Sequence, residues 1–164
     1  MGLKVADPQA AQKAGVAMKK RALLIFAAWS QVMTRFEKAM YENPDQDLNK
    51  LWWDIVEKYQ FVTRPPQRTS PDWAAKIHFA VAPCYYHNYM LGELLASQLH
   101  HCLVTDVLNA GSDRDVSYIG QQRAGRFLKI KVFEAGDLYS WNQMIERATG
   151  EPLTAKYFVE QFVK

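Results

Sequence analysis

The chain has 164 residues, of which 49% are hydrophobic and 23% are charged, and its formal net charge is +3. This composition is typical of one globular domain with a single core, and it excludes an intrinsically disordered chain. The small positive charge gives no reason to expect a nucleic acid partner. No apolar run approaches the roughly 20 residues that a membrane-spanning helix needs.

The N-terminal part is expected to form a long helix. Asp7 and Pro8 suit the N-cap and the first helical position, and no further proline follows before Tyr41. Gly15 predicts a break or kink early in this helix. An apolar stripe at helical spacing indicates the core face: Leu23/Leu24, Ala27/Ala28, Gln31/Val32, Phe36 and Ala39/Met40.

A second helix is expected over residues 47–59, after a turn at residues 43–45. Trp52 and Trp53 are adjacent, so they cannot both face inward equally, and one of them is free to contact a partner surface. Residues 64–68 contain two prolines and predict an extended linker.

The most informative stretch is residues 74–98. Lys76 and His78 are two residues apart and would share a face in an extended segment. A central helix is predicted from about residue 83 to residue 109, because Pro83 suits a first helical turn. Tyr86 and Tyr89 fall on one face of this helix with Glu93, and its core face is expected to hold Leu91, Leu95, Leu99 and Cys102.

These side chains allow two interpretations. An ammonium, an imidazole and three phenols (Tyr85, Tyr86 and Tyr89) near one helix start suit a site for an anionic group. Tyrosine and histidine are also common as half-buried structural residues, and on residue type alone a structural role is the more frequent outcome.

The C-terminal third predicts three further helices: residues 116–134 before Gly136, a short helix capped by Ser140, and a last helix capped by Thr154. No run shows sustained period-2 alternation, so strands should be few. The predicted fold is therefore all-α, an irregular multi-helix array in a single helical domain over residues 1–164. Cys84 and Cys102 would lie about 27 Å apart on the central helix, which predicts free thiols.

Several blocks of the chain resemble one known family. A-K-x-H at residues 75–78 is followed by Y-x-x-Y at residues 86–89, and W-W-x-x-x-x-K-Y-Q at residues 52–60 is followed by a proline pair and an arginine. With the G-x-x-x-x-W segment at residues 136–141 and the closing YFVEQF, these blocks are similar to the C-terminal part of the angiotensin-converting enzyme family of zinc dipeptidyl carboxypeptidases. The resemblance covers roughly residues 22–162.

The resemblance implies a role for each site residue. Lys76 would hold the C-terminal carboxylate of a peptide substrate, with Tyr86 as its hydrogen-bonding partner. His78 would hydrogen-bond the substrate near the scissile amide, and Tyr89 would donate to the oxyanion. The gap from His78 to Tyr89 is one residue longer than in the animal enzymes, so Tyr85 competes with Tyr86 for the carboxylate.

Two departures from the family pattern concern ions. The residue before the second tyrosine is Asn88, where the animal enzymes have a chloride-binding arginine. The family's zinc motif, H-E-x-x-H with a later glutamate, is missing: the chain's histidines are His78, His87, His100 and His101, no two are four apart, and none precedes a glutamate. The resemblance thus predicts the C-terminal subdomain of a gluzincin-type peptidase, with no metal ligands here, zinc held elsewhere in the parent, and no activity when the chain is alone.

The implied partners are a peptide substrate, the missing N-terminal catalytic part and a second copy of the fragment in a homodimer. A secreted or periplasmic parent would fit the family. The alternative is a non-catalytic helical binding module that takes a small anion or a peptide end. An upstream reading frame that encodes H-E-x-x-H and a later glutamate would favour the peptidase.

Overall fold

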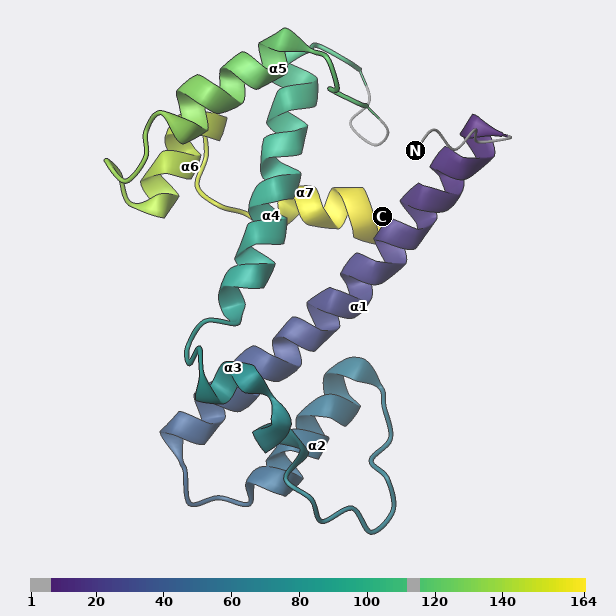
Figure 1. The fold of residues 1–164 in the computed structure, drawn as a ribbon, viewed down its shortest axis with the longest axis vertical. Coiled ribbons are helices and arrows are strands. Elements are labelled where there is room, and N and C mark those ends of the chain that lie inside the picture. The colour runs from purple at the N-terminus through teal and green to yellow at the C-terminus, as the bar shows by residue number, and fades with distance from the viewer. Residues whose placement is uncertain (1–6, 112–115) are drawn as a thin grey trace. The chain divides into compact units, whose positions relative to one another are not determined.

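The computed structural model describes residues 7–111 and 116–164, and all regular structure in these two stretches is helical (Figure 1). This confirms the all-α fold class. The chain divides into two compact units, Met1–Leu91 and Gly92–Lys164. A single domain over residues 1–164 stays a prediction.

The first unit opens with helix α1, Pro8–Glu42. Asp7 caps its N-terminus, where the carboxylate oxygen accepts the backbone N–H of Ala10 at 3.0 Å, as the Asp-Pro pair predicts. The helix runs unbroken through Gly15, so the predicted break there is wrong. One glycine costs only about 1 kcal/mol relative to alanine, which a 35-residue helix tolerates.

Helix α2, Leu48–Gln60, packs against α1 and with it forms the core of the first unit (Figure 1). Asp47 caps α2 through the backbone N–H of Lys50 at 2.9 Å. Trp52 is 3% exposed, whereas Trp53 is half-buried, so the two tryptophans differ as expected. The buried residues of this core are Val32, Met33, Phe36, Trp52, Val56 and Tyr86.

The linker after α2 is tied back to that helix. Arg64 forms ion pairs with Asp54 at 2.5 Å and with Glu57 at 3.0 Å. Hydrogen bonds from Lys50 and Arg64 lower the pKa of the Asp54 carboxyl group, and hydrogen bonds from Arg64 lower the pKa of Glu57. The linker leads into a 3-10 helix, Asp72–Ala75, and a single-turn helix α3, Ile77–Ala80. This segment carries Lys76 and His78, the first two residues of the candidate site.

Helix α4, His87–Cys102, begins four residues later than predicted. Cys84 has a positive φ of 57° and its backbone N–H donates to the buried carboxylate of Glu37 at 2.6 Å. Both features hold residues around Pro83 in a turn, so Pro83 does not open the helix. Beyond Cys102, α4 passes into a π-helical segment, Leu103–Val107.

Within its described residues, the second unit contains the rest of α4 and the α-helices α5, α6 and α7. Helix α5, Gln122–Phe127, continues as a π-helical segment, Leu128–Phe133, so the predicted start at residue 116 is wrong. Helix α6, Trp141–Thr149, begins after Ser140 and closes at Gly150, whose φ is 90°, as predicted. Helix α7, Lys156–Phe158, follows Thr154, whose hydroxyl accepts the Lys156 N–H at 3.2 Å, and continues as a π-helical segment, Val159–Val163.

The α4 residue that is buried most deeply in this unit is Gln98, which is 1% exposed. Its amide nitrogen donates to the Thr149 hydroxyl at 2.8 Å, and its amide oxygen accepts the Thr154 N–H at 3.1 Å. Of the four residues predicted to form the core face of α4, Cys102 is buried, as predicted. The other three, Leu91, Leu95 and Leu99, are only half-buried. The buried face of α4 therefore includes Gln98 and not the predicted leucines, because the Gln98 amide forms hydrogen bonds with the segment between α6 and α7.

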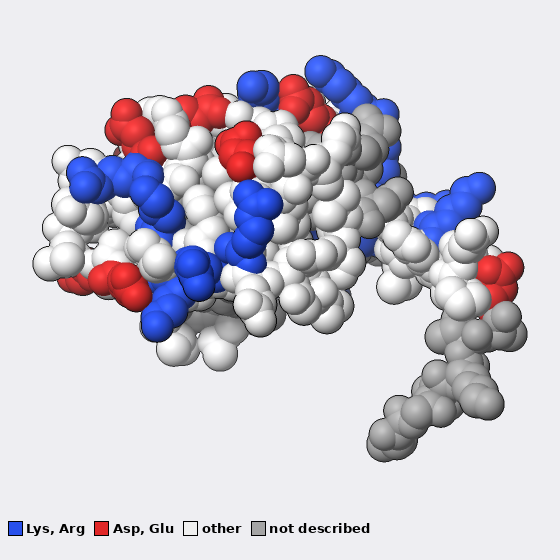
Figure 2. Space-filling view, turned by 90° about the horizontal axis from the view of Figure 1, so that it is seen from above, with Lys and Arg blue, Asp and Glu red and all other residues white. Residues whose placement is uncertain are grey.

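Basic and acidic side chains are interspersed on the face shown in Figure 2. Within the described residues, no helix is both long enough and apolar enough to cross a membrane.

Candidate functional site

The five predicted site residues all lie in the first unit, on consecutive short segments. Lys76 follows the 3-10 helix, and His78 lies in α3. Tyr85 and Tyr86 precede α4, and Tyr89 lies in its first turn. The prediction that Lys76 and His78 share an extended segment is wrong, because the backbone becomes helical directly after Lys76.

His78 and Tyr89 form the centre of the site. The His78 Nε2 atom lies 3.4 Å from the Tyr89 hydroxyl, and their rings meet edge to face with centroids 5.8 Å apart. Tyr89 as a whole is 43% exposed. A phenol beside an imidazole at this distance can donate a hydrogen bond to an oxygen that gains negative charge.

Tyr86 forms the buried wall of the site. Its ring lies edge to face against His78, with centroids 4.8 Å apart, and 5.0 Å from the ring of Tyr89. Its hydroxyl accepts the indole N–H of Trp29 at 2.6 Å. Burial raises the pKa of the Tyr86 phenol, and the hydrogen bond from Trp29 opposes this rise. The phenol is therefore neutral at physiological pH and keeps a proton to donate.

Lys76 is held by two aromatic rings. Its Nζ atom lies 5.2 Å from the ring centroid of Trp29 and 5.7 Å from that of Trp52, both within the range of a cation–π contact. Among the described residues no carboxylate forms an ion pair with Lys76. The ammonium therefore keeps its charge available for an anionic ligand.

Tyr85 differs from Tyr86 in its surroundings. It is 47% exposed, and among the described residues the one aromatic ring that it contacts is that of Tyr89, edge to face at 5.5 Å. Tyr86 is 7% exposed and shares the Trp29 ring with Lys76. Trp29 is thus a site residue that sequence reasoning missed, since it lies on α1, 57 positions before Tyr86.

A cavity of about 370 Å³ lies beside the loop that carries the tyrosines, and its lining includes Glu37, Tyr41, Cys84 and His87. Glu37 holds the loop through the Cys84 N–H. The Cys84 thiol is free and exposed, and the Cys102 thiol is free and buried, which confirms the expectation of free thiols.

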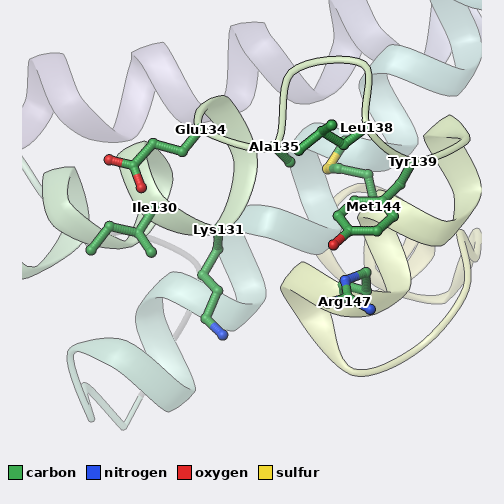
Figure 3. Close-up of a pocket in the computed structure, with 8 residues that line it drawn as sticks. All are labelled: Ile130, Lys131, Glu134, Ala135, Leu138, Tyr139, Met144 and Arg147. Atoms are coloured by element: carbon green, nitrogen blue, oxygen red, sulfur yellow. The ribbon is translucent and has the colours of Figure 1, made fainter.

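A second cavity, of about 410 Å³, lies within the second unit between the segment after α5 and helix α6 (Figure 3). The Arg147 guanidinium packs on the ring of Tyr139 at 4.3 Å beside this cavity. No predicted site residue lines it: its walls are Ile130, Lys131, Glu134, Ala135, Leu138, Tyr139, Met144 and Arg147.

Within residues 7–111 and 116–164, no three His, Cys, Asp or Glu side chains are grouped so that they could hold a metal ion. A catalytic zinc needs three such protein ligands. The described side chains therefore do not fit a zinc site.

Comparison with known proteins finds one family and several relatives that match most of the chain. The family model described as angiotensin-converting enzyme, peptidase family M2, covers residues 14–163. The chain is 27% identical over 153 residues to the angiotensin-converting enzyme-like protein Ace3 of Mus musculus, an alignment that covers 90% of this chain and 20% of that protein.

Two further relatives agree with this match. Angiotensin-converting enzyme of Mus musculus is 30% identical over 123 residues, 73% of this chain and 9% of that enzyme. Thermostable carboxypeptidase 1 of Pyrococcus furiosus is 26% identical over 115 residues, 70% of this chain and 22% of that protein. No solved structure matches the chain significantly. The chain spans about a fifth of the length of Ace3, and it belongs to the angiotensin-converting enzyme family, peptidase family M2.

Proposed function

We propose that this chain is the substrate-binding C-terminal part of a zinc metallopeptidase that releases dipeptides from peptide C-termini. The observation that carries the proposal is the cluster in which His78 lies 3.4 Å from the Tyr89 hydroxyl and against the ring of Tyr86. Membership of the M2 family supports a peptidase parent.

Each side chain has a task in this scheme. The Lys76 ammonium binds the C-terminal carboxylate, and the Tyr86 phenol donates a hydrogen bond to the same group. His78 hydrogen-bonds the substrate beside the scissile amide. Tyr89 donates its proton in a hydrogen bond to the carbonyl oxygen as negative charge develops there.

The surroundings of the two adjacent tyrosines favour Tyr86 over Tyr85 for the carboxylate. Tyr86 packs on Trp29, the ring that also holds the Lys76 ammonium, whereas the one ring contact of Tyr85 among the described residues is with Tyr89. Two groups that bind one carboxylate must converge, and contact with the same indole ring supports Tyr86 as the partner of Lys76.

Zinc belongs to the proposal only as a cofactor of the parent, where it would supply an activated water. Its ligands would come from the N-terminal catalytic part, because the described side chains do not group into a metal site. A peptide substrate, this N-terminal part and a second copy of the chain are the proposed partners.

The carboxylate site can be tested on the 164-residue chain by NMR titration with N-acetyl-Ala-Leu and with its C-terminal amide. We expect the free acid to shift the resonances of Tyr86 and Tyr89 and to bind at least 10-fold more tightly than the amide. In Lys76→Ala this preference should disappear. Equal binding of acid and amide by the native chain would reject the carboxylate site.

A non-catalytic helical module that binds a small anion or a peptide end is the second candidate. It is favoured by the side chains themselves, since the cluster is assembled without any metal-binding group among the described residues. Dipeptide release by a longer chain that includes the upstream part would exclude this candidate, and binding without hydrolysis would support it.

A further inference from the structure

We propose that Trp29 is a positioning residue that sets the direction of the Tyr86 hydroxyl and the location of the Lys76 ammonium, and so aligns both groups on one carboxylate. This inference rests on the proposed function. It adds a residue of α1 to a site whose other members lie between residues 76 and 89.

The direction of the hydroxyl follows from the hydrogen-bonding capacity of indole. The Nε1–H group of tryptophan can only donate, so the Tyr86 oxygen must be the acceptor in the 2.6 Å contact. The single phenolic proton must then point elsewhere, and no acceptor for it is found among the described residues. A ligand oxygen is the partner that this arrangement leaves to be supplied.

The location of the ammonium depends on the same indole ring. The Lys76 Nζ atom lies 5.2 Å from the Trp29 centroid, and the Tyr86 ring meets the Trp29 ring edge to face at 6.4 Å. Trp29 therefore contacts both groups that the proposal assigns to the carboxylate. A lysine side chain has many rotamers, and the aromatic contact removes much of this freedom before a ligand arrives.

The position of Trp29 is itself fixed. Its ring packs edge to face on Trp52 at 5.9 Å, and Trp52 is 3% exposed in the core between α1 and α2. The Trp29 indole thus connects the packed core between α1 and α2 to the Tyr86 phenol, which lies in the loop before α4. A tyrosine anchored only by its loop would lose more conformational freedom on binding.

The experiment uses Trp29→Phe, which keeps an aromatic ring near Lys76, removes the N–H donor and makes the ring smaller. Loss of one hydrogen bond should weaken binding of N-acetyl-Ala-Leu by about 3- to 10-fold and leave its amide unaffected. Trp29→Leu, which also removes the ring, should weaken it further. Trp73→Phe is the matched control, because its indole donates instead to Asn49, at 3.0 Å.

An independent readout is the indole N–H resonance of Trp29, assigned by its absence in Trp29→Phe. It should shift in Tyr86→Phe, where the acceptor is gone, and stay in place in Tyr85→Phe. Thermal unfolding of each variant shows whether the fold is retained.

The outcomes separate the two proposals. If the native chain prefers the free acid and Trp29→Phe binds it as tightly as the native chain does, the positioning role is overturned and the carboxylate site stands. If the native chain binds acid and amide equally, both proposals are rejected. An indole resonance that does not shift in Tyr86→Phe would show that Trp29 does not donate a hydrogen bond to Tyr86, and this would also overturn the positioning role.

Discussion

The three tyrosines of the candidate site, Tyr85, Tyr86 and Tyr89, have the same side chain but different surroundings. Tyr86 is buried and its hydroxyl already accepts a hydrogen bond, whereas Tyr85 and Tyr89 are about half exposed. Only Tyr89 places its hydroxyl beside an imidazole, 3.4 Å from His78. The contacts of the phenols therefore support Tyr86 as the proposed partner of the carboxylate, whereas the family resemblance had left Tyr85 in competition with it.

The role of Tyr89 predicts a specific kinetic effect in a parent enzyme that includes the upstream part. Tyr89→Phe removes the proposed donor to the oxyanion, and loss of such a donor should lower kcat by on the order of 100-fold or more with little change in KM. Steady-state kinetics of dipeptide release measures both constants. Tyr85→Phe is the matched control and should retain nearly all activity. A rise in KM at constant kcat would assign Tyr89 to substrate binding instead.

The two cysteines predict a clear difference in thiol reactivity. Burial, with a contribution from the charge of Asp106, raises the pKa of the Cys102 thiol to about 11, whereas Cys84 is exposed. At pH 8 only about 0.1% of a thiol with that pKa is thiolate, so an aromatic disulfide reagent should modify Cys84 first and Cys102 only after unfolding. Cys84→Ser should remove the fast phase.

The same shift has a consequence for stability. The unfolded Cys102 thiol loses its proton near pH 8.5, and the folded thiol keeps its proton up to about pH 11. The contribution of this group to the free energy of unfolding is therefore complete below pH 8.5 and declines as the pH rises toward 11. Cys102→Ala should lack this component of the pH dependence.

At the scale of elements, the sequence predicted helix starts well where a side chain caps the backbone locally. Asp7, Asp47 and Ser140 each stand directly before a helix, and Gly150 ends one with a positive φ. Capping depends on residues within one turn, so it can be read from the sequence.

The failures have non-local causes. Helix α4 begins at His87 because the carboxylate of Glu37 accepts the Cys84 N–H and holds the turn before the helix. Glu37 lies 47 positions before Cys84. Trp29 was missed for the same reason, since its partner Tyr86 is far along the chain. The buried face of α4 was predicted from leucines, but Gln98 is buried because it bonds to a loop more than fifty residues away.

Gln98 provides a prediction for the second unit. Gln98→Ala leaves the Thr154 N–H and nearby carbonyl groups without their partner, and such a loss costs about 1–3 kcal/mol of the free energy of unfolding. Urea denaturation should show a lower midpoint for this variant. Gln122→Ala, at an exposed position of α5, should unfold like the native chain. Equal midpoints for the native chain and Gln98→Ala would show that the segment between α6 and α7 is held by other contacts.

At the scale of the whole molecule, the chain contains the proposed substrate-binding groups and, among its described residues, no metal-binding group. We therefore predict that the purified chain does not release dipeptides, even when zinc is added, because no water can be activated. Chromatography of a peptide substrate measures product, and calorimetry measures zinc binding. Stoichiometric zinc binding at sub-micromolar affinity would contradict this prediction.

The exposed apolar side chains of α1 predict self-association. Met18 is 71% exposed and Ile25 is 67% exposed, and these residues lie seven positions apart, on one face of the helix. Large exposed apolar side chains that share a face favour contact with another chain, and a symmetric dimer is the commonest way to cover them. We expect light scattering at about 100 µM to give about twice the monomer mass of 18.9 kDa.

Charge substitutions test whether α1 forms that contact. Met18→Lys and Ile25→Lys should each lower the dimer fraction, because a charge buried in an apolar interface is costly without a partner. Ile119→Lys, at a position that is 92% exposed in the second unit, should leave the mass unchanged. A native chain that stays at 18.9 kDa at this concentration would end the argument for dimerisation. It would also weaken the proposal of an N-terminal catalytic part as a partner, since an apolar face that stays uncovered in solution gives no evidence that another part covers it.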